Sequence, residues 1–360
     1  MYDNCRLFQS SRYFPFQMLI SLGRDTIKRL LQFPRTQKTL KKSEVPLLFH
    51  EPGIETGYRP PNKPWTYYFI SAFQLHNESM NIWTHLIGFF VVGAAMVYYH
   101  QKLNFLSAQL YPMVIFGLTC LAFSLLSTAA HLLEAKSFFV HHFAYFLDYA
   151  GVGLYGFGTM TILSYYSADK RILQFFGAYF TPVNAIMAVT SCFCSCYGKL
   201  SYMRPYPIQR KLLNIVGNAV HLVLFAGPVF CRMFTEDASQ TDQVRAIAFN
   251  KHLSCLLTFV IAVTFFATHL PEKWCPGKFD IFGYSHAFFH ISVIITVLLQ
   301  FDAAAYELGT RDMGETFKWL TEPLSLFVYL MAVLVADAAI IISFHGKAKE
   351  IAEKYEKQIS

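Results

Sequence analysis

Two histidines four residues apart, His286 and His290, carry the strongest chemical signal in this chain. On a helix, this spacing places both imidazoles on one face, about 5–6 Å apart at Cβ, where they can offer two nitrogens to one metal ion. His131, which follows Ser127 by four residues, could supply a third nitrogen. Three histidines with an open fourth position are typical of catalytic zinc, which lowers the pKa of its bound water to about 7. The spacing is therefore compatible with a metal centre.

Four more polar residues belong to the same candidate site. Asp148 could accept a hydrogen bond from a metal-bound water and act as a general base. Glu78, Asn81 and His85 are spaced by three and four residues, which places them on one helical face. There they could hold the ligating histidines by hydrogen bonding to them. Contacts with solvated lipid headgroups explain the same three residues equally well.

The histidines also have an ordinary explanation. A lone histidine near a helix end is more often interfacial, or hydrogen-bonded to a neighbouring backbone group, than a metal ligand. In a bilayer core, however, an ionisable group is costly and usually faces the interior of the bundle, which makes each one a candidate functional residue. The choice depends on whether the elements that carry these side chains bring them together.

The composition indicates that those elements lie in a membrane. Of the 360 residues, 54% are hydrophobic and 15% are charged, against roughly a quarter charged in an average soluble domain. The 36 Phe and 21 Tyr residues would be hard to bury in a soluble core, whereas lipid accepts Phe throughout and Tyr at the interface. The net charge of +7 comes from Lys and Arg residues between apolar blocks, so we expect no nucleic-acid partner.

Eight apolar stretches are long enough to cross a hydrocarbon core of about 30 Å. They predict an all-α, polytopic integral membrane bundle, with a seven-helix core and an eighth transmembrane helix, over residues 82–100, 111–133, 143–166, 172–196, 212–233, 248–270, 284–302 and 319–344. The fourth stretch carries Pro182 and Asn184, and the last carries Glu322, Pro323 and Asp337. A seven-span alternative omits the last stretch.

These stretches divide the chain into a basic head over residues 1–80, a transmembrane domain over 81–345 and a short tail over 346–360. Residues 17–33 of the head interleave basic and apolar side chains, which favours an amphipathic helix on the membrane surface over plain disorder. With the N-terminus in the cytoplasm, 22 of the 30 Lys and Arg residues lie on the cytoplasmic side, or 11 against eight without the head. This orientation places all the candidate site residues in the cytoplasmic leaflet.

Three segments occur in the same order as in one known family. They are SAFQLHNESMNIWTHLIG at 71–88, LSTAAHLL…HHFAYFLDYAGVGLYGFGT from 126 to 159, and HLPEKWCPGKFDIFGYSHAFFH at 269–290. Together they extend over nearly all the helical core, and they resemble the progestin and adipoQ receptor family. EVPLLFHEPGIETGYRP at 44–60 and YMRPYPIQRK at 202–211 are most similar to its membrane progestin receptor branch, of the alpha and beta type.

The resemblance implies a seven-helix bundle with a cytoplasmic N-terminus and, in this branch, an eighth helix. In the family's adiponectin receptor branch, the matching positions hold a zinc ion close to the cytoplasmic leaflet. Carried over to this chain, the zinc ligands would be His131, His286 and His290. Asp148 would hold the metal-bound water, and Ser127 would line the site.

One position departs from the family pattern. Ala287 stands where a polar residue, commonly Gln, follows the first histidine of the last motif. This change could loosen a contact behind the ligands, but it removes no ligand.

Two functions of different classes follow. The first is a plasma-membrane receptor for progestin-type steroids, in which the ligand enters from the bilayer, binds an aromatic-lined cavity and shifts the bundle between conformations. Such a receptor would have membrane lipids around it and, as a claim of the family, G proteins as partners. The alternative is a zinc-dependent, ceramidase-like hydrolase of sphingolipid-like amides, with Asp148 and Ser127 as catalytic residues. Hydrolysis could also be the receptor's output, so the sequence leaves open whether the chain is an enzyme.

Overall fold

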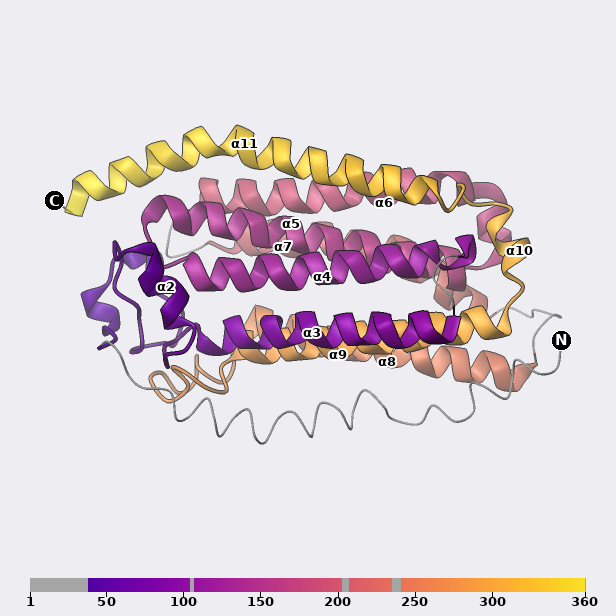
Figure 1. Cartoon of the computed structure of the whole chain (residues 1–360), viewed down its shortest axis with the longest axis horizontal. Coiled ribbons are helices and arrows are strands. Elements are labelled where there is room, and N and C mark those ends of the chain that lie inside the picture. The colour runs from indigo at the N-terminus through magenta and orange to yellow at the C-terminus, as the bar shows by residue number, and fades with distance from the viewer. Residues whose placement is uncertain (1–37, 104–106, 203–206, 235–240, 360) are drawn as a thin grey trace.

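The computed structural model describes residues 38–103, 107–202, 207–234 and 241–359, and long helices dominate it (Figure 1). The amphipathic helix predicted at residues 17–33 lies outside the described residues. The α-helices are α2 (Trp65–Ser71), α3 (Ser79–Leu103), α4 (Tyr111–Leu133), α5 (Phe138–Ile162), α6 (Lys170–Ser201), α7 (Ile208–Met233), α8 (Asp242–Thr268), α9 (Ser285–Thr310), α10 (Met313–Phe317) and α11 (Ser325–Ile359).

Seven helices in the described part of the chain are long and apolar enough to cross a membrane. They are α3, α4 with the short turn before it, α6, α7, α8, α9 and α11. Helices suit this environment because lipid offers no hydrogen bonds, and every backbone group of a helix is paired within its own segment. The polytopic helical bundle expected from the sequence is therefore confirmed.

For two of the predicted spans, the last stretch and α5, the structure shows whether the helix is apolar enough to cross a membrane. The last stretch qualifies as a membrane span, because α11 begins at Ser325 and leaves Glu322 and Pro323 in the preceding turn. Instead, α5 is the long helix that does not qualify as a membrane span by length and composition. It carries His141, His142 and Asp148. Most residues of α5 are buried against other helices, so it needs less apolar character than a helix that faces lipid. With α5, the described part of the chain has eight long helices, as the sequence predicts.

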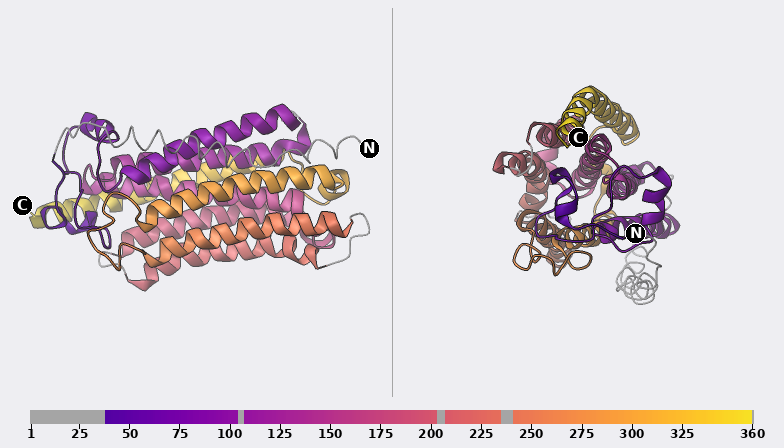
Figure 2. Two further views of the ribbon diagram at one scale, coloured as in Figure 1. Left: turned by 90° about the horizontal axis from the view of Figure 1, so that it is seen from below. Right: turned by 90° about the vertical axis from the view of Figure 1, so that its left-hand side faces the viewer.

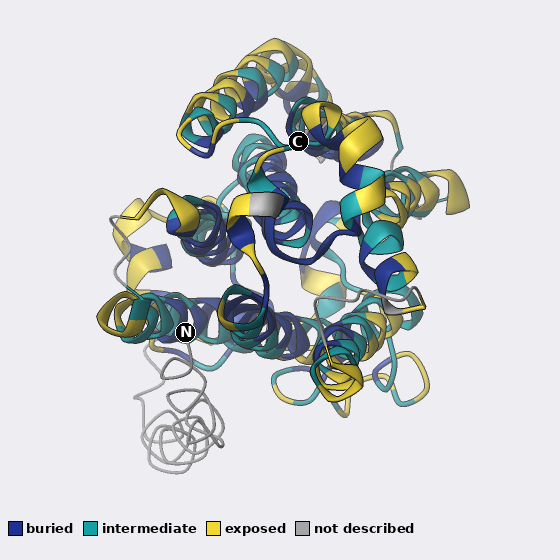
Figure 3. Ribbon diagram, turned by 90° about the vertical axis from the view of Figure 1, so that its right-hand side faces the viewer, coloured by how far each residue is buried: buried dark blue, intermediate teal, exposed yellow. Residues whose placement is uncertain are grey.

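The long helices form an elongated ring with one helix on its outside (Figures 1 and 2). In the ring, α3 packs against α4 and α9, α5 packs against α4 and α6, α7 packs against α6, and α8 packs against α9. The eighth helix, α11, packs on the outer side of α5 and α6. Buried residues line the interior, whereas exposed residues face outward (Figure 3). Large apolar side chains such as Phe175, Val223 and Val335 are among those exposed, as expected where lipid is the solvent.

Small residues let α5 approach its neighbours closely. A Cβ atom placed on Gly153 would lie 2.8 Å from the backbone oxygen of Ala188 on α6. A Cβ atom placed on Gly158 would lie 2.0 Å from Thr119 Oγ1 on α4. Membrane helices commonly use small residues in this way, because close backbone approach replaces the hydrophobic effect as the source of packing energy.

A substitution at this contact gives a direct test of the packing. We expect Gly153→Ala to separate α5 from α6 and to lower stability by about 1–3 kcal/mol, because the added methyl group meets a backbone atom that cannot rotate away. The midpoint of thermal unfolding in detergent measures the effect. Gly93→Ala on α3 is the matched control, since a Cβ atom there meets nothing within 4 Å. Equal midpoints for the two variants would contradict the close α5–α6 contact.

Candidate metal centre

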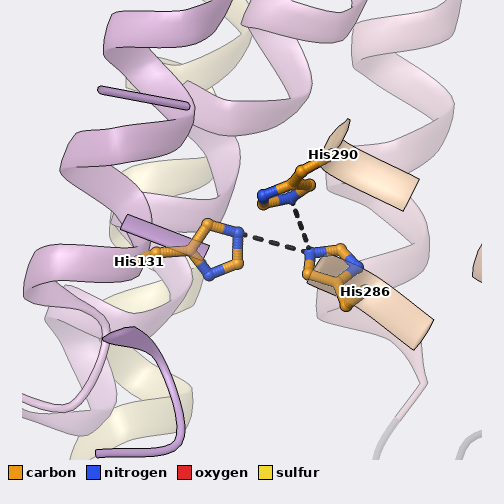
Figure 4. A group of neighbouring side chains, drawn as sticks. All are labelled: His131, His286 and His290. Carbon is orange, nitrogen blue, oxygen red and sulfur yellow. Dashed lines mark hydrogen bonds between the residues drawn. The ribbon is translucent and has the colours of Figure 1, made fainter. Parts of the chain in front are cut away.

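Three histidine rings meet at one end of the bundle (Figure 4). His131 comes from the last turn of α4, and His286 and His290 come from the first two turns of α9. The Nε2 atom of His286 lies 3.3 Å from Nε2 of His131 and 3.1 Å from Nε2 of His290. The potential ligand atoms of all three lie within 4.8 Å of one another, and His131 and His290 are buried. Three imidazole nitrogens that converge in this way could hold one metal ion.

Partners on the far side of two rings orient them toward this centre. His131 Nδ1 lies 2.7 Å from the Glu78 carboxylate, and His290 Nδ1 lies 3.1 Å from the Thr84 hydroxyl. A histidine whose Nδ1 is engaged by a carboxylate or another polar partner presents Nε2 to a metal, and the partner fixes the orientation of the ring. Both rings are therefore arranged as metal-ligating histidines usually are.

Glu78 lies at the centre of a small polar network just before α3. Asn81 Nδ2 donates to Glu78 Oε2 at 2.7 Å, and Asn77 Nδ2 donates to Glu78 Oε1 at 3.1 Å. Burial raises the pKa of Glu78, but the hydrogen bond and charge of His131 and the hydrogen bond from Asn81 oppose it and bring the pKa down to about 2. An ionised carboxylate behind His131 favours a cation on the other side of the ring.

His85, which the sequence groups with Glu78 and Asn81, has a different place. Its ring centroid lies 4.0 Å from that of His290, and the two rings meet edge to face. Both ring nitrogens of His85 are buried without a hydrogen-bond partner among the described residues. It therefore packs on a candidate ligand instead of hydrogen bonding to one.

Asp148 and Ser127 lie beside the histidines but outside the ligand cluster. Both line the cavity that His286 and His290 also line, and the Ser127 hydroxyl interacts with the Asp148 carboxyl group. Asp148 Oδ1 is buried without a hydrogen-bond partner in the described part of the chain. An unpaired acceptor next to three converging imidazoles is suited to contact a metal ion through water, as the resemblance implies for Asp148.

Sequence reasoning missed the residues that hold the two ligand-bearing helix ends. The guanidinium group of Arg59 donates to the backbone oxygens of His131 and Leu132, each at 2.6 Å, and thereby caps the C-terminus of α4. At the start of α9, Ser285 N donates to Glu272 Oε2 at 2.7 Å. Glu272 lies in the loop before α9, so a carboxylate there also complements the positive end of the helix dipole.

The N-terminal head is fixed to that same loop. Asp280 accepts from the backbone N–H groups of Glu55 at 3.0 Å and Thr56 at 2.8 Å, and from the Thr56 hydroxyl at 2.6 Å. The only sequence signal for these contacts is that the residues fall inside segments that match the family, such as 44–60. Charge and spacing gave no sign that Arg59 reaches α4.

A cavity of about 540 Å³ runs from the histidine cluster into the bundle, and its walls are mostly apolar. At one end it is lined by His85, Ser127, Asp148, His286 and His290. Other polar residues that line the cavity, and that were not predicted from the sequence, include Tyr155, Asn214, Asn218, His221 and Gln300. A mostly apolar cavity with a few polar groups is the usual form of a small-molecule site.

The fold and this site define a multi-pass integral membrane protein whose helices surround a mostly apolar cavity that reaches a cluster of three histidines. Residues 73–301 match the family described as haemolysin-III related, and the chain belongs to that family. It is 34% identical over 316 residues to membrane progestin receptor beta of Homo sapiens, covering 86% of this chain and 88% of the relative. It is 35% identical over 282 residues to membrane progestin receptor alpha of Homo sapiens, covering 77% of this chain and 79% of the relative. Membrane progestin receptor alpha-B of Danio rerio is 33% identical over 338 residues, covering 92% and 94%.

The Glu78–His131 pair gives a test of the metal centre. We expect Glu78→Gln to weaken metal binding roughly 10- to 100-fold, because the ring of His131 loses the charged partner that orients it and raises its basicity. Metal retained by the purified protein across a series of chelator concentrations, measured by elemental analysis, gives the difference. Glu55→Gln is the control, because that carboxylate is half exposed and pairs with Lys42 at 2.7 Å in the head. If the two variants retained metal equally, Glu78 would have no role at the centre.

Proposed function

We propose that the protein is a plasma-membrane receptor for progestin-type steroids, with a zinc ion held by His131, His286 and His290. The observation that carries the proposal is its likeness, at 34 to 35% identity over most of the chain, to proteins named membrane progestin receptors. The cavity supports it, because about 540 Å³ of mostly apolar space inside a membrane bundle suits a neutral polycyclic ligand.

The donor set supports zinc as the metal. Zinc takes imidazole nitrogens in tetrahedral geometry and often keeps one position for a non-protein ligand. Here the three Nε2 atoms converge, and His286 and His290 also line the cavity. When bound, zinc would polarise an oxygen atom placed at the open position. Asp148 and Ser127, on the same part of the cavity wall, would orient that oxygen by hydrogen bonding.

Helix α9 gives the ligand a physical route to a signal. It carries two of the three candidate zinc ligands, lines the cavity beyond them, and is joined through its preceding loop to the head. A ligand that binds better to one arrangement of α9 than to another shifts the population toward that arrangement. The cytoplasmic placement of the head and the coupling to G proteins stay predictions.

Metal analysis and steroid binding on one preparation test the receptor proposal. We expect about one zinc per chain and saturable binding of radiolabelled progesterone by the full-length protein in detergent. Replacing His131, His286 and His290 by Ala should remove the zinc and weaken steroid binding, because two of these rings form one end of the cavity.

The Thr258→Val variant is the control, since Thr258 is half-buried on α8 outside the cavity lining and its hydroxyl bonds within its own helix. It should match the parent in zinc content and in steroid affinity. A zinc-loaded parent protein without saturable steroid binding would contradict the receptor proposal. A zinc-free parent protein that still binds steroid would contradict the zinc assignment alone.

A lipid amide hydrolase is the second candidate, because Asp148, Ser127 and the histidine cluster share one cavity. In that reaction water adds to the amide carbonyl and the amine leaves with a proton. Asp148 is placed to accept the proton from water and to return it to the leaving amine. A ceramide-like substrate is the class that the apolar cavity would admit.

Asp148→Asn separates this activity from metal binding. The change keeps the size of the side chain but removes the proton acceptor, so any ceramide hydrolysis should fall by roughly 10²- to 10⁴-fold. Zinc content should stay near the parental value, because Asp148 is not part of the ligand cluster. Release of fatty acid from ceramide by the purified variant gives the rate. Hydrolysis at the parental rate would exclude Asp148 as the general base.

A further inference from the structure

Two polar residues line the cavity far from the histidine cluster, and the proposed function assigns them no role. They are Gln300 on α9 and Tyr155 on α5. Gln300 follows His290 by ten residues on one helix, which places it about 15 Å further along the helix axis. Gln300 is 8% exposed and Tyr155 is 7% exposed, so both lie in the interior of the bundle.

The oxygen of the Gln300 amide is hydrogen-bonded, whereas its nitrogen has no hydrogen-bond partner among the described residues. The Tyr155 hydroxyl donates to Gln300 Oε1 at 3.1 Å. The Nε2 atom of Gln300 carries two N–H donors, and no group among the described residues accepts a hydrogen bond from them. Because Gln300 lines the cavity, these donors are placed where an oxygen of a ligand can accept from them. Such a hydrogen bond adds roughly 0.5–1.5 kcal/mol to binding.

The cavity wall restricts what this oxygen can be. Among the described residues that line it, Asp148 is the one carboxylate, and none is a lysine or an arginine. On the cavity wall a charged ligand group would have no lysine or arginine, and no carboxylate other than Asp148, to pair with, which is unfavourable. A neutral carbonyl oxygen has no such cost. It accepts a hydrogen bond near the plane of the carbonyl group, where the N–H of a side-chain amide can approach it.

We propose that Gln300, held in place by Tyr155, is a second recognition point that donates a hydrogen bond to a neutral carbonyl oxygen of the ligand. This inference rests on the proposed steroid receptor function and narrows its ligand class. The ligand is elongated, apolar and uncharged, with one oxygen near His286, His290 and Asp148 and another at Gln300. A steroid with a ketone at each end has this form. A ceramide does not, because its polar groups lie together and its chains end in methyl groups.

Steroids that lack one ketone oxygen test the assignment. The purified full-length protein, with its metal, is titrated with progesterone, with its 3-deoxy analogue and with its 20-deoxy analogue. We expect the analogue that lacks the oxygen at Gln300 to bind the parent protein about tenfold more weakly than progesterone, as for the loss of one hydrogen bond. Gln300→Leu should bind progesterone about tenfold more weakly and should no longer distinguish it from that analogue.

Two further variants make the result specific. Thr296→Val is the matched control, since Thr296 is buried on α9 outside the cavity lining and its hydroxyl donates to Ser292 O at 2.9 Å. It should discriminate among the three steroids as the parent does. Tyr155→Phe keeps the aromatic ring but releases Gln300 Oε1, so it should reduce discrimination of the same analogue, even if Gln300→Leu does not fold.

The outcomes separate this inference from the function on which it rests. If the parent protein binds progesterone, and Gln300→Leu and Tyr155→Phe both keep the parental discrimination between the analogues, the role of Gln300 is wrong and the receptor proposal stands. If the parent protein, with its metal, binds none of the three steroids, the receptor proposal and the recognition point are both wrong.

Discussion

The carboxylate of Glu78 is the group on which the polar end of this bundle depends. It is buried and ionised, and a buried charge is tolerated only when it is paired and hydrogen-bonded. Its partners come from different parts of the chain, with His131 from the end of α4 and Asn81 from the start of α3. The need to pair one charge therefore brings two helix ends together and points a histidine nitrogen into the bundle.

The same requirement fixes the opposite end of the bundle. Glu307 on α9 is buried, accepts from Arg232 Nη1 on α7 at 3.1 Å, and lies 3.0 Å from His252 Nε2 on α8. Three helices are thus joined by one buried charge, far along α9 from His290. Between these two polar ends most contacts of the helices are apolar, with a few interhelical hydrogen bonds such as Tyr155–Gln300. The cavity extends through this region from the histidine cluster, and its walls can stay mostly apolar because the two polar ends hold the helices in place.

The sequence predicted the elements better than the contacts between them. The stretch 111–133 coincides with α4, since a long apolar run between polar flanks has few other structures in lipid. The spacing of His286 and His290 predicted a shared face, and the structure brings His131, the predicted third histidine, next to it. These inferences need only helical periodicity, so they were accessible from one sequence.

The contacts that orient the candidate ligands were not accessible in the same way. Arg59 and Glu272 lie in segments without regular periodicity, and their partners are fixed only when the head and the loop before α9 fold onto the helix ends. Gln300 lies in an apolar stretch of sequence, where a single amide gives no functional signal. Its role depends on a cavity that several helices form together. Residues that act through tertiary contacts thus cannot be identified from one sequence before the packing of the helices is known.

A receptor and a hydrolase would use the histidine end of this cavity in the same way, because both place an oxygen of the ligand next to a metal and Asp148. The difference between them lies further along the cavity. A hydrolase of lipid amides needs an apolar channel for a chain, and a buried amide donor in that channel would stay unpaired and weaken substrate binding. A receptor for a rigid ligand with an oxygen at each end gains affinity from the same donor. The direction in which Gln300 contributes to binding therefore distinguishes the two functions, even though the reactive end of the site does not.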